Sequence, residues 1–396
     1  MARTAARSTA LRAFAGPEAN ELAILCSSGA GASDVVREAE AAYRELAALL
    51  ASHGAALENV AGETIFVRDA RRELPLVLGT RARVLATLGQ TDGAPLPAFI
   101  EQAPADPVSA FAVAASAVVP HRRDAFSAHD VRALASCPCE GCARSGARLI
   151  RLGEQSALHT TNVYGAGGDA FEQAWDAFCA AERLLEQCGM DFRDVVRTWI
   201  HLRDIDRDYD ALNKARREFF RDRGVEPRPA STGVQGAPLP CAHDLSLGIQ
   251  AVKSSRPLGA VVMSTPLLNE AWSYGVDFSR GLRMADANKV ALHVSGTASI
   301  DEAGRTVHAG DLALQTGRML DNIASLLAGQ DAGFENVMSA VVYVKRREDA
   351  PQVRARCEER GFAGFPCAFV EAPLCRPDLL CEAEAVAMLP LAAAGA

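Results

Sequence analysis

One pattern of residues occurs three times along this chain. Each copy has a pair of leucines, then a glycine, a valine and a short apolar run that ends on a basic residue. The copies align on Val60, Val195 and Val337, with the leucine pair at positions −11 and −10 and the basic residue at +8 in all three. The valines are 135 and 142 residues apart. Because about 150 residues make one ordinary domain, the repeat predicts three tandem units of one fold.

The residues that flank each copy indicate its secondary structure. Alternating apolar residues at 147–163 and 290–300 predict paired strands before the first helix. A second helical stretch and a further pair of strands follow the apolar run in every copy. We therefore expect an α+β fold, with a small mixed sheet and two helices on one face in each unit. The expected divisions are a degenerate first unit at 1–120, a cysteine-containing linker at 121–146, a second unit at 147–256 and a third at 257–396.

Charge and hydropathy exclude several classes of protein. The chain has 41 Lys and Arg against 49 Asp and Glu, a net charge of −8, and no long basic run. This balance argues against a nucleic acid or an anionic membrane as partner. The longest weakly polar runs, 109–120 and 383–396, are shorter than the ~20 residues that span a bilayer. The 11 cysteines are an odd number and lie mostly in apolar runs, which is typical of reduced thiols, so we expect a cytoplasmic protein.

Several segments of the second and third units resemble the RidA/YjgF superfamily. These segments are RTW at 197–199, PASTG at 229–233, SGTASI at 295–300, RTVHAGD at 305–311, LDN at 320–322, YVKRRED at 343–349 and CRPDLLCEAE at 375–384. The resemblance implies the small RidA fold, also described as chorismate-mutase-like, with trimers and active sites in clefts between neighbouring units. Within the superfamily, these two units are most similar to the chorismatases. The first 120 residues depart from the N-terminal segment of those enzymes.

Glu382 is the main candidate for a catalytic acid. It lies among apolar residues in a predicted strand at 379–386, where desolvation would raise its pKa and keep it protonated. A neutral carboxylic acid is suited to protonating an electron-rich carbon–carbon double bond, and the resemblance gives the acid of this strand that role. Glu384 points to the same face and is a weaker candidate. The matching strands at 244–250 and 111–115 have no acid at this place, so we expect one active cleft per chain.

Cys375 and Gly296 indicate a particular branch of the resemblance. Cys375 lies in a loop seven residues before Glu382, and Gly296 lies in a predicted strand. In chorismatases, Cys and Gly at these places mark the type that makes 3-hydroxybenzoate, whereas Ala at both marks the type that hydrolyses. The resemblance therefore implies a catalytic part for Cys375. A strand glycine such as Gly296 also often allows a ligand or another backbone to come close.

Further residues are candidates for binding substrate. The segment 274–281 resembles a chorismatase stretch near the substrate, and its Arg280 could hold a carboxylate through two hydrogen bonds. Chorismatases tend to have proline residues before the phenylalanine of this segment, whereas this chain has Val276 and Asp277 there. The Asp277 carboxylate would either pair with an arginine or disfavour an anionic substrate. The other candidate substrate contacts are Tyr274, Arg347 and Gly233.

Cys137, Cys139 and Cys142 place three thiols within six residues. Structural zinc usually has four ligands, and this spacing lacks a second matched pair, although His129 or His121 could supply a fourth. Incidental loop thiols are the favoured interpretation. The chain has no P-loop, dinucleotide fingerprint or nucleophile elbow, so we expect no cofactor.

The favoured function is that of a chorismatase-like enzyme, which protonates the enol double bond of chorismate and releases pyruvate and a hydroxybenzoate, preferably 3-hydroxybenzoate. An enamine or imine deaminase is the alternative, because it needs the same first protonation. The arginine that binds substrate carboxylate in such deaminases would fall at Cys367 or Ser231 here. A non-catalytic binding protein is the third possibility. The expected partner is a small anionic substrate, with assembly as a homotrimer or as a pseudo-trimer within one chain.

Overall fold

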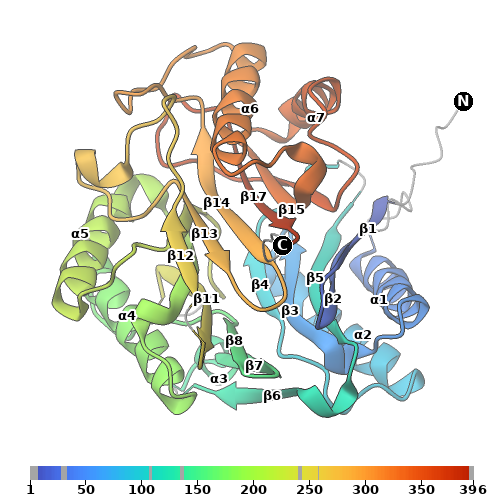
Figure 1. Ribbon diagram of the computed structural model, residues 1–396. Helices are drawn as coiled ribbons and strands as arrows, with labels where there is room; N and C mark the ends of the chain where they lie inside the picture. Colours follow the sequence, from blue (N-terminus) through green and yellow to red (C-terminus); the bar gives the residue numbers. More distant parts are fainter. Residues whose placement is uncertain are drawn as a thin grey trace, which may run out of the picture.

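The computed structural model describes residues 8–27, 34–106, 109–133, 138–239, 243–256 and 258–391. Three mixed sheets form the inner part of the molecule, and the long helices lie on the outside (Figure 1). The predicted α+β class, with three units of a small mixed sheet and helices, is confirmed. Among the described residues, no helix combines the length and the apolar character needed to cross a membrane.

The first unit has a five-stranded sheet in the order β1-β2-β5-β3-β4. Its strands are β1 (Ser8–Ala15), β2 (Ala19–Ser27), β3 (Val60–Val67), β4 (Ala98–Glu101) and β5 (Phe111–Pro120), and its helices are α1 (Val35–Ser52) and α2 (Ala70–Thr87). Strands β3 and β4 are parallel, and the other neighbours are antiparallel.

The second and third units repeat this strand order, each with one extra strand at the edge next to the first hairpin. The second unit contains β6 (Phe126–Arg132), α3 (Glu140–Ala143), β7 (Gly146–Leu152), β8 (Gln155–Thr160), α4 (Ala170–Gln187), β9 (Val195–Leu202), α5 (Ile205–Arg223), β10 (Ala230–Gln235) and β11 (Leu245–Ser254). The third unit contains β12 (Gly259–Val262), β13 (Gly281–Ala285), β14 (Val290–Ala298), α6 (Leu312–Ala328), β15 (Val337–Val344), α7 (Ala350–Glu359), β16 (Cys367–Glu371) and β17 (Cys381–Leu389).

The repeated residues have the same structural role in every unit. The leucine pair lies near the end of the first helix, and Leu50, Leu185 and Leu327 are fully buried. The repeated valine is the first residue of β3, β9 or β15, the strand that follows that helix. The spacing is constant because one helix end and one strand start must pack into the same core in each unit.

One predicted division differs from the structure. The segment 121–146 was expected to be a linker, but it contributes β6, which pairs with β7 at the edge of the second sheet. Its polar composition reflects the largely exposed side chains of an edge strand rather than an unstructured connection. The remaining boundaries stay predictions.

Each unit contacts the other two. Isolated bridges join Glu101 to Ala237, Pro104 to Val370, and Ala230 to Ser279, which are pairs from three different combinations of units. The three sheets enclose a central cavity of about 310 Å³ that residues of all three units line. The sheets therefore form a closed ring around one interior, with seams where neighbouring units meet.

Candidate active site at the seam of the second and third units

Glu382 lies in the central strand β17, opposite Ala298 of β14 and Tyr343 of β15. Its side chain is buried, with 4% of the residue exposed. Burial, with a smaller contribution from the charge of Glu384, raises the pKa of Glu382 to about 8, although Arg280, Arg197 and Arg376 act to lower it. The carboxyl is therefore mainly protonated at neutral pH, as its apolar strand predicted.

Gly296 provides the space that the Glu382 carboxyl occupies. A Cβ atom on Gly296 would lie 2.0 Å from Oε1 of Glu382 and 3.1 Å from Cγ2 of Thr232. The Gly296 amide donates a hydrogen bond to Thr232 Oγ1 at 3.0 Å, and the Ser231 amide donates to Ser295 Oγ at 2.8 Å. These bonds join β10 of the second unit to β14 of the third, so Glu382 lies at a seam between units.

Glu384 has a different environment from Glu382, although both lie on one face of β17. Its carboxylate accepts hydrogen bonds from Arg197 Nη2 and Trp199 Nε1, both at 2.8 Å, and from the Tyr343 hydroxyl at 3.1 Å. Arg197 is only 1% exposed, so this is a buried ion pair. The two acids thus differ in their surroundings, because Glu384 is paired with Arg197 whereas burial raises the pKa of Glu382.

Two arginines flank the Phe278 ring beside this seam. The guanidinium carbons of Arg216 and Arg280 lie 5.3 and 5.5 Å from its centroid. Arg216 Nη1 donates to Ser231 Oγ at 3.2 Å, and Arg280 Nε donates to the Asn269 carbonyl at 2.9 Å. Both arginines are buried, and Arg280 lies close enough to Glu270 for its charge to act to lower the pKa of that carboxyl.

Cys375 joins the same group of side chains. Burial raises the pKa of the Cys375 thiol to about 12, and the charge of Glu382 adds to this effect, whereas a hydrogen bond with Tyr209 opposes it. The thiol is therefore neutral near pH 7 and is not a thiolate nucleophile. A Cβ on Gly233 would lie 3.4 Å from the Tyr209 ring, so Gly233 is also close to this group.

The remaining predicted contacts lie elsewhere or are not described. Arg347 donates hydrogen bonds to the carbonyls of Asp106 and Ser109 in the first unit. Tyr274 ends a short turn at Ala271–Tyr274, and its side chain is outside the described part of the chain. Asp277 pairs with Arg228 at 2.8 Å, which is the first of the two roles expected for it.

The thiol cluster has a different histidine partner from those considered in the sequence. His243, and neither His129 nor His121, lies against Cys139 and Cys142. Cys137 lies outside the described residues.

The strand register confirms that the acid is present only in the third unit. Tyr343 lies opposite Glu382, whereas the equivalent residues of the other units lie opposite Ser246 and Ala112. The two positions at which a deaminase would have its carboxylate-binding arginine, Ser231 and Cys367, are also equivalent in the structure. Ser231 pairs with Thr198 and Cys367 with Ala340, and each partner lies three residues after the repeated valine. Neither unit has an arginine at that place.

The sequence alone predicts no role for several residues of the site. They are Arg197, Trp199, Tyr209, Arg216, Thr232 and Tyr343. A signal existed for Arg197, because it is a charged residue in a short strand that also contains Val195, Val196, Ile200 and Leu202. A charged side chain in such a strand needs a buried partner, which Glu384 provides.

A family model described as endoribonuclease L-PSP matches residues 147–253 and 276–389, which together exceed half of the chain. The chain belongs to this RidA/YjgF family. The matched ranges correspond to the second and third units, and the first unit of this RidA/YjgF protein lies outside them.

Two curated relatives of this RidA/YjgF protein share the same percentage identity with it. The 3-hydroxybenzoate synthase of Streptomyces hygroscopicus is 29% identical over 241 residues, which are 54% of this chain and 68% of the relative. The chorismatase of Streptomyces rapamycinicus is 29% identical over 219 residues, or 50% of this chain and 65% of the relative. The chain thus spans about two thirds of the length of each relative.

A chorismatase crystal structure has the same fold. It matches with a TM-score of 0.60 at 20% identity, over 83% of this chain and 93% of that one. The matched share exceeds what the second and third units contain together, so the likeness extends into the first unit. The family model does not reach the first unit, so only the fold shows this part of the likeness.

Proposed function

We propose that this chain is a chorismatase-like enzyme that cleaves the enolpyruvyl ether of chorismate into pyruvate and a hydroxybenzoate. The observation that carries the proposal is the buried Glu382 carboxyl, whose raised pKa keeps a proton available in a seam lined by arginines. The chorismatase and 3-hydroxybenzoate synthase relatives support this choice of substrate.

The arginines beside the seam suit an anionic substrate. Chorismate has two carboxylates and an unsaturated ring. Arg280 and Arg216 would bind carboxylate groups, while Phe278, which lies near both, would contact the ring. Their positive charge would also offset the repulsion expected from a chain of net charge −8.

The reaction begins with proton transfer from Glu382 to the methylene carbon of the enolpyruvyl group. In the hydrolytic route water attacks the central carbon of the resulting oxocarbenium ion, the bond from that carbon to the ether oxygen breaks, and pyruvate leaves while both oxygens stay on the ring. In the aromatising route a ring hydroxyl instead displaces the ether oxygen from the ring, pyruvate leaves with that oxygen, and a ring proton is lost. The positive charges of Arg280, Arg197 and Arg376 stabilise the Glu382 carboxylate that remains. Chorismic acid contains the same atoms as pyruvic acid and hydroxybenzoic acid together, so the aromatising route consumes no water and no oxidant.

The neutral Cys375 thiol supports 3-hydroxybenzoate as the product. It lies close enough to Glu382 for the acid's charge to act on its pKa, and it retains its proton during the reaction. We propose that it assists aromatisation by contacting the ring intermediate rather than by forming a covalent bond to it. Water addition without aromatisation would give a dihydroxycyclohexadiene carboxylate instead.

The test is incubation of the full chain with chorismate, followed by chromatography for pyruvate and hydroxybenzoates. Glu382→Gln retains the side-chain shape but has no acidic proton, so its kcat should fall by roughly 10²–10⁴-fold, the usual contribution of a general acid. Glu348→Gln, at an exposed position of the same unit, is the matched control. Full activity of Glu382→Gln would overturn the assigned mechanism. Release of ammonia from an amino-acid-derived enamine, with no turnover of chorismate, would favour the deaminase alternative.

A further inference from the structure

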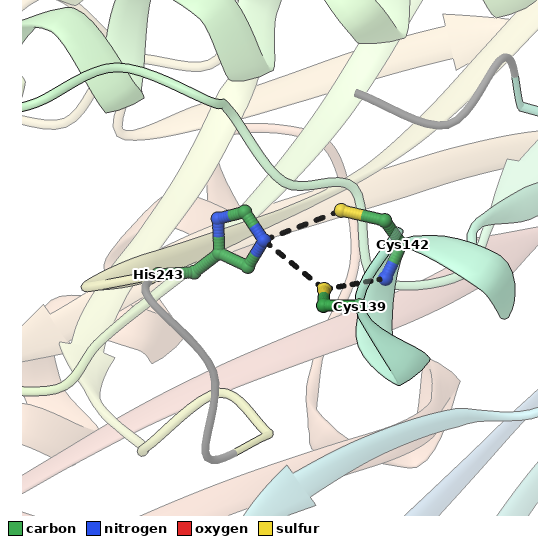
Figure 2. Close-up of side chains that lie close together, drawn as sticks. All are labelled: Cys139, Cys142 and His243. Atoms are coloured by element: carbon green, nitrogen blue, oxygen red, sulfur yellow. Dashed lines mark hydrogen bonds between the residues drawn. The ribbon is translucent and has the colours of Figure 1, made fainter. Parts of the chain in front are cut away.

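A second group of reactive side chains lies away from the Glu382 seam. Cys139 is the N-cap residue of the short helix α3, Cys142 lies within that helix, and His243 precedes β11 (Figure 2). More than one hundred residues of chain separate the histidine from the two cysteines. The fold of the second unit therefore brings together two loops that have no sequence proximity.

The three ligand atoms converge on one point. Nε2 of His243 lies 3.4 Å from Sγ of Cys139 and 3.2 Å from Sγ of Cys142, and all three atoms lie within 4.8 Å of one another. Zinc binds thiolate sulfur at ~2.3 Å and imidazole nitrogen at ~2.0–2.1 Å, so ligand atoms around a tetrahedral ion lie roughly 3.5 Å apart. The separations observed here therefore fit a single shared ion.

The histidine is already oriented as a ligand. Its Nδ1 lies 2.8 Å from the Gly165 carbonyl, and because a carbonyl only accepts, Nδ1 must be the protonated nitrogen. The lone pair of Nε2 then faces the two sulfurs. A backbone carbonyl on the second nitrogen is the usual outer partner of a metal-bound histidine. Stacking on Tyr164, with centroids 4.9 Å apart, further fixes the ring.

Hydrogen bonds among the three side chains explain this arrangement less well than a bound metal ion does. One Nε2 lone pair can accept one thiol proton in good geometry, yet two sulfurs approach it at nearly equal distances. A metal ion binds both sulfurs and the nitrogen without such competition. Cys142 and His243 are 2% and 3% exposed, so an ion bound there would be largely shielded from water.

We propose that Cys139, Cys142 and His243 form a structural zinc site in the second unit. Two thiolates and an imidazole are a ligand set that favours zinc over oxygen-seeking ions such as calcium or magnesium. The three side chains supply three of the four ligands of a tetrahedral zinc ion, and the fourth ligand comes from outside this group. The cysteines lose their thiol protons when the ion binds.

The proposed ion would fix a part of the second unit that leads to the active site. The His243 carbonyl accepts a hydrogen bond from Arg203 at 2.9 Å, and the adjacent Asp244 pairs with Arg207 at 3.0 Å in the first turn of α5. The same helix carries Tyr209 and Arg216. Zinc bound to the folded chain should therefore raise its thermal stability and help to place α5.

The experiment measures zinc by elemental analysis in the full chain, purified without chelators, and adds cobalt to chelator-treated protein. We expect one zinc per chain and, with cobalt, an absorption band for thiolate-to-metal charge transfer. His243→Ala and Cys142→Ser should lower zinc affinity by more than the roughly 10–100-fold that loss of an outer-shell partner costs. Cys179→Ser, in α4 of the same unit, is the matched control and should retain the ion.

Wild-type protein that contains no zinc and shows no charge-transfer band with cobalt would overturn the proposal. Equal zinc content in Cys142→Ser and wild-type protein would do the same. The cobalt titration uses wild-type chain, so the proposal stays testable even if a ligand variant fails to fold. Neither readout depends on chorismate turnover, so the zinc site can fail or succeed independently of the proposed enzyme activity.

Discussion

Replacing Gly296 with alanine tests whether the position of the Glu382 carboxyl matters for catalysis. The added Cβ would lie 2.0 Å from Oε1 of Glu382, whereas such contacts essentially never fall below 3.0 Å. The carboxyl must therefore move by at least about 1 Å, because the strand backbone on either side is held by hydrogen bonds to β10 and β17. The end of the Glu382 side chain can make this movement without unfolding the sheet.

A displacement of about 1 Å of a reacting group can lower the rate by roughly 10²-fold. This corresponds to about 2.7 kcal/mol of transition-state stabilisation. Folding should suffer little, since alanine in a strand is favoured over glycine by roughly 0.5–1 kcal/mol, which offsets part of the cost of moving the carboxyl. Gly296→Ala should therefore lose activity while its thermal midpoint changes by only a few degrees.

The assay is steady-state turnover of chorismate, accompanied by thermal denaturation of the same samples. Gly317→Ala is the control, because its added Cβ would meet only Arg356 Nη2, at 3.9 Å, on a helix of the same unit. Wild-type kcat in Gly296→Ala would refute the reasoning that a carboxyl resting against Gly296 delivers the proton. A large loss of thermal stability would show instead that the added methyl disturbs the sheet.

Four further predictions concern the same group of residues. Because the folded-state pKa of Glu382 is raised to about 8, kcat should decline as pH rises through that value, and a rate that increases from pH 8 to 9 would contradict its role as the acid. The same shift means that the contribution of Glu382 to folding stability is complete below its ordinary pKa of 4.5 and is lost as pH rises toward 8. The thermal midpoint of Glu382→Gln should therefore decline less over this range than that of the wild type. Glu384→Gln removes a charge that raises the Glu382 pKa, so the falling limb of the pH–rate profile should shift to lower pH, and an unmoved limb would exclude this coupling. The same substitution leaves Arg197 without its ion-pair partner, which should cost roughly 3–5 kcal/mol of folding stability. Cys375→Ala should shift the product from hydroxybenzoate toward the dihydroxycyclohexadiene carboxylate, and an unchanged product ratio by chromatography would remove Cys375 from the mechanism.

The repeated fold could be predicted because its signal is local. A leucine pair, a turn and a valine lie within a dozen residues, and each of them packs into the core of its own unit. Strand β6 was missed for the opposite reason, since an edge strand with exposed side chains has the polar composition of a linker.

The candidate site could be predicted only in part. The apolar neighbours of Glu382 in its own strand indicated the raised pKa. The contacts that complete the site come from distant parts of the chain, such as Arg197 with Glu384, 187 residues apart. A buried arginine in a strand indicates that the side chain has a polar partner, but it does not identify that partner. The same limit applies to His243, whose approach to Cys139 depends on how two loops pack.

The closed ring of units has a consequence for how the protein responds to dilution. In an assembly of separate subunits, a site built at a seam is lost when the subunits dissociate, and its occupancy depends on protein concentration. Here β10 and β14, whose residues meet beside Glu382, belong to one polypeptide, so each remains at a high effective concentration for the other. Specific activity per chain should accordingly remain constant down to very low protein concentrations. The covalent connection also lets the other two seams diverge, because a substitution there changes only one of the three.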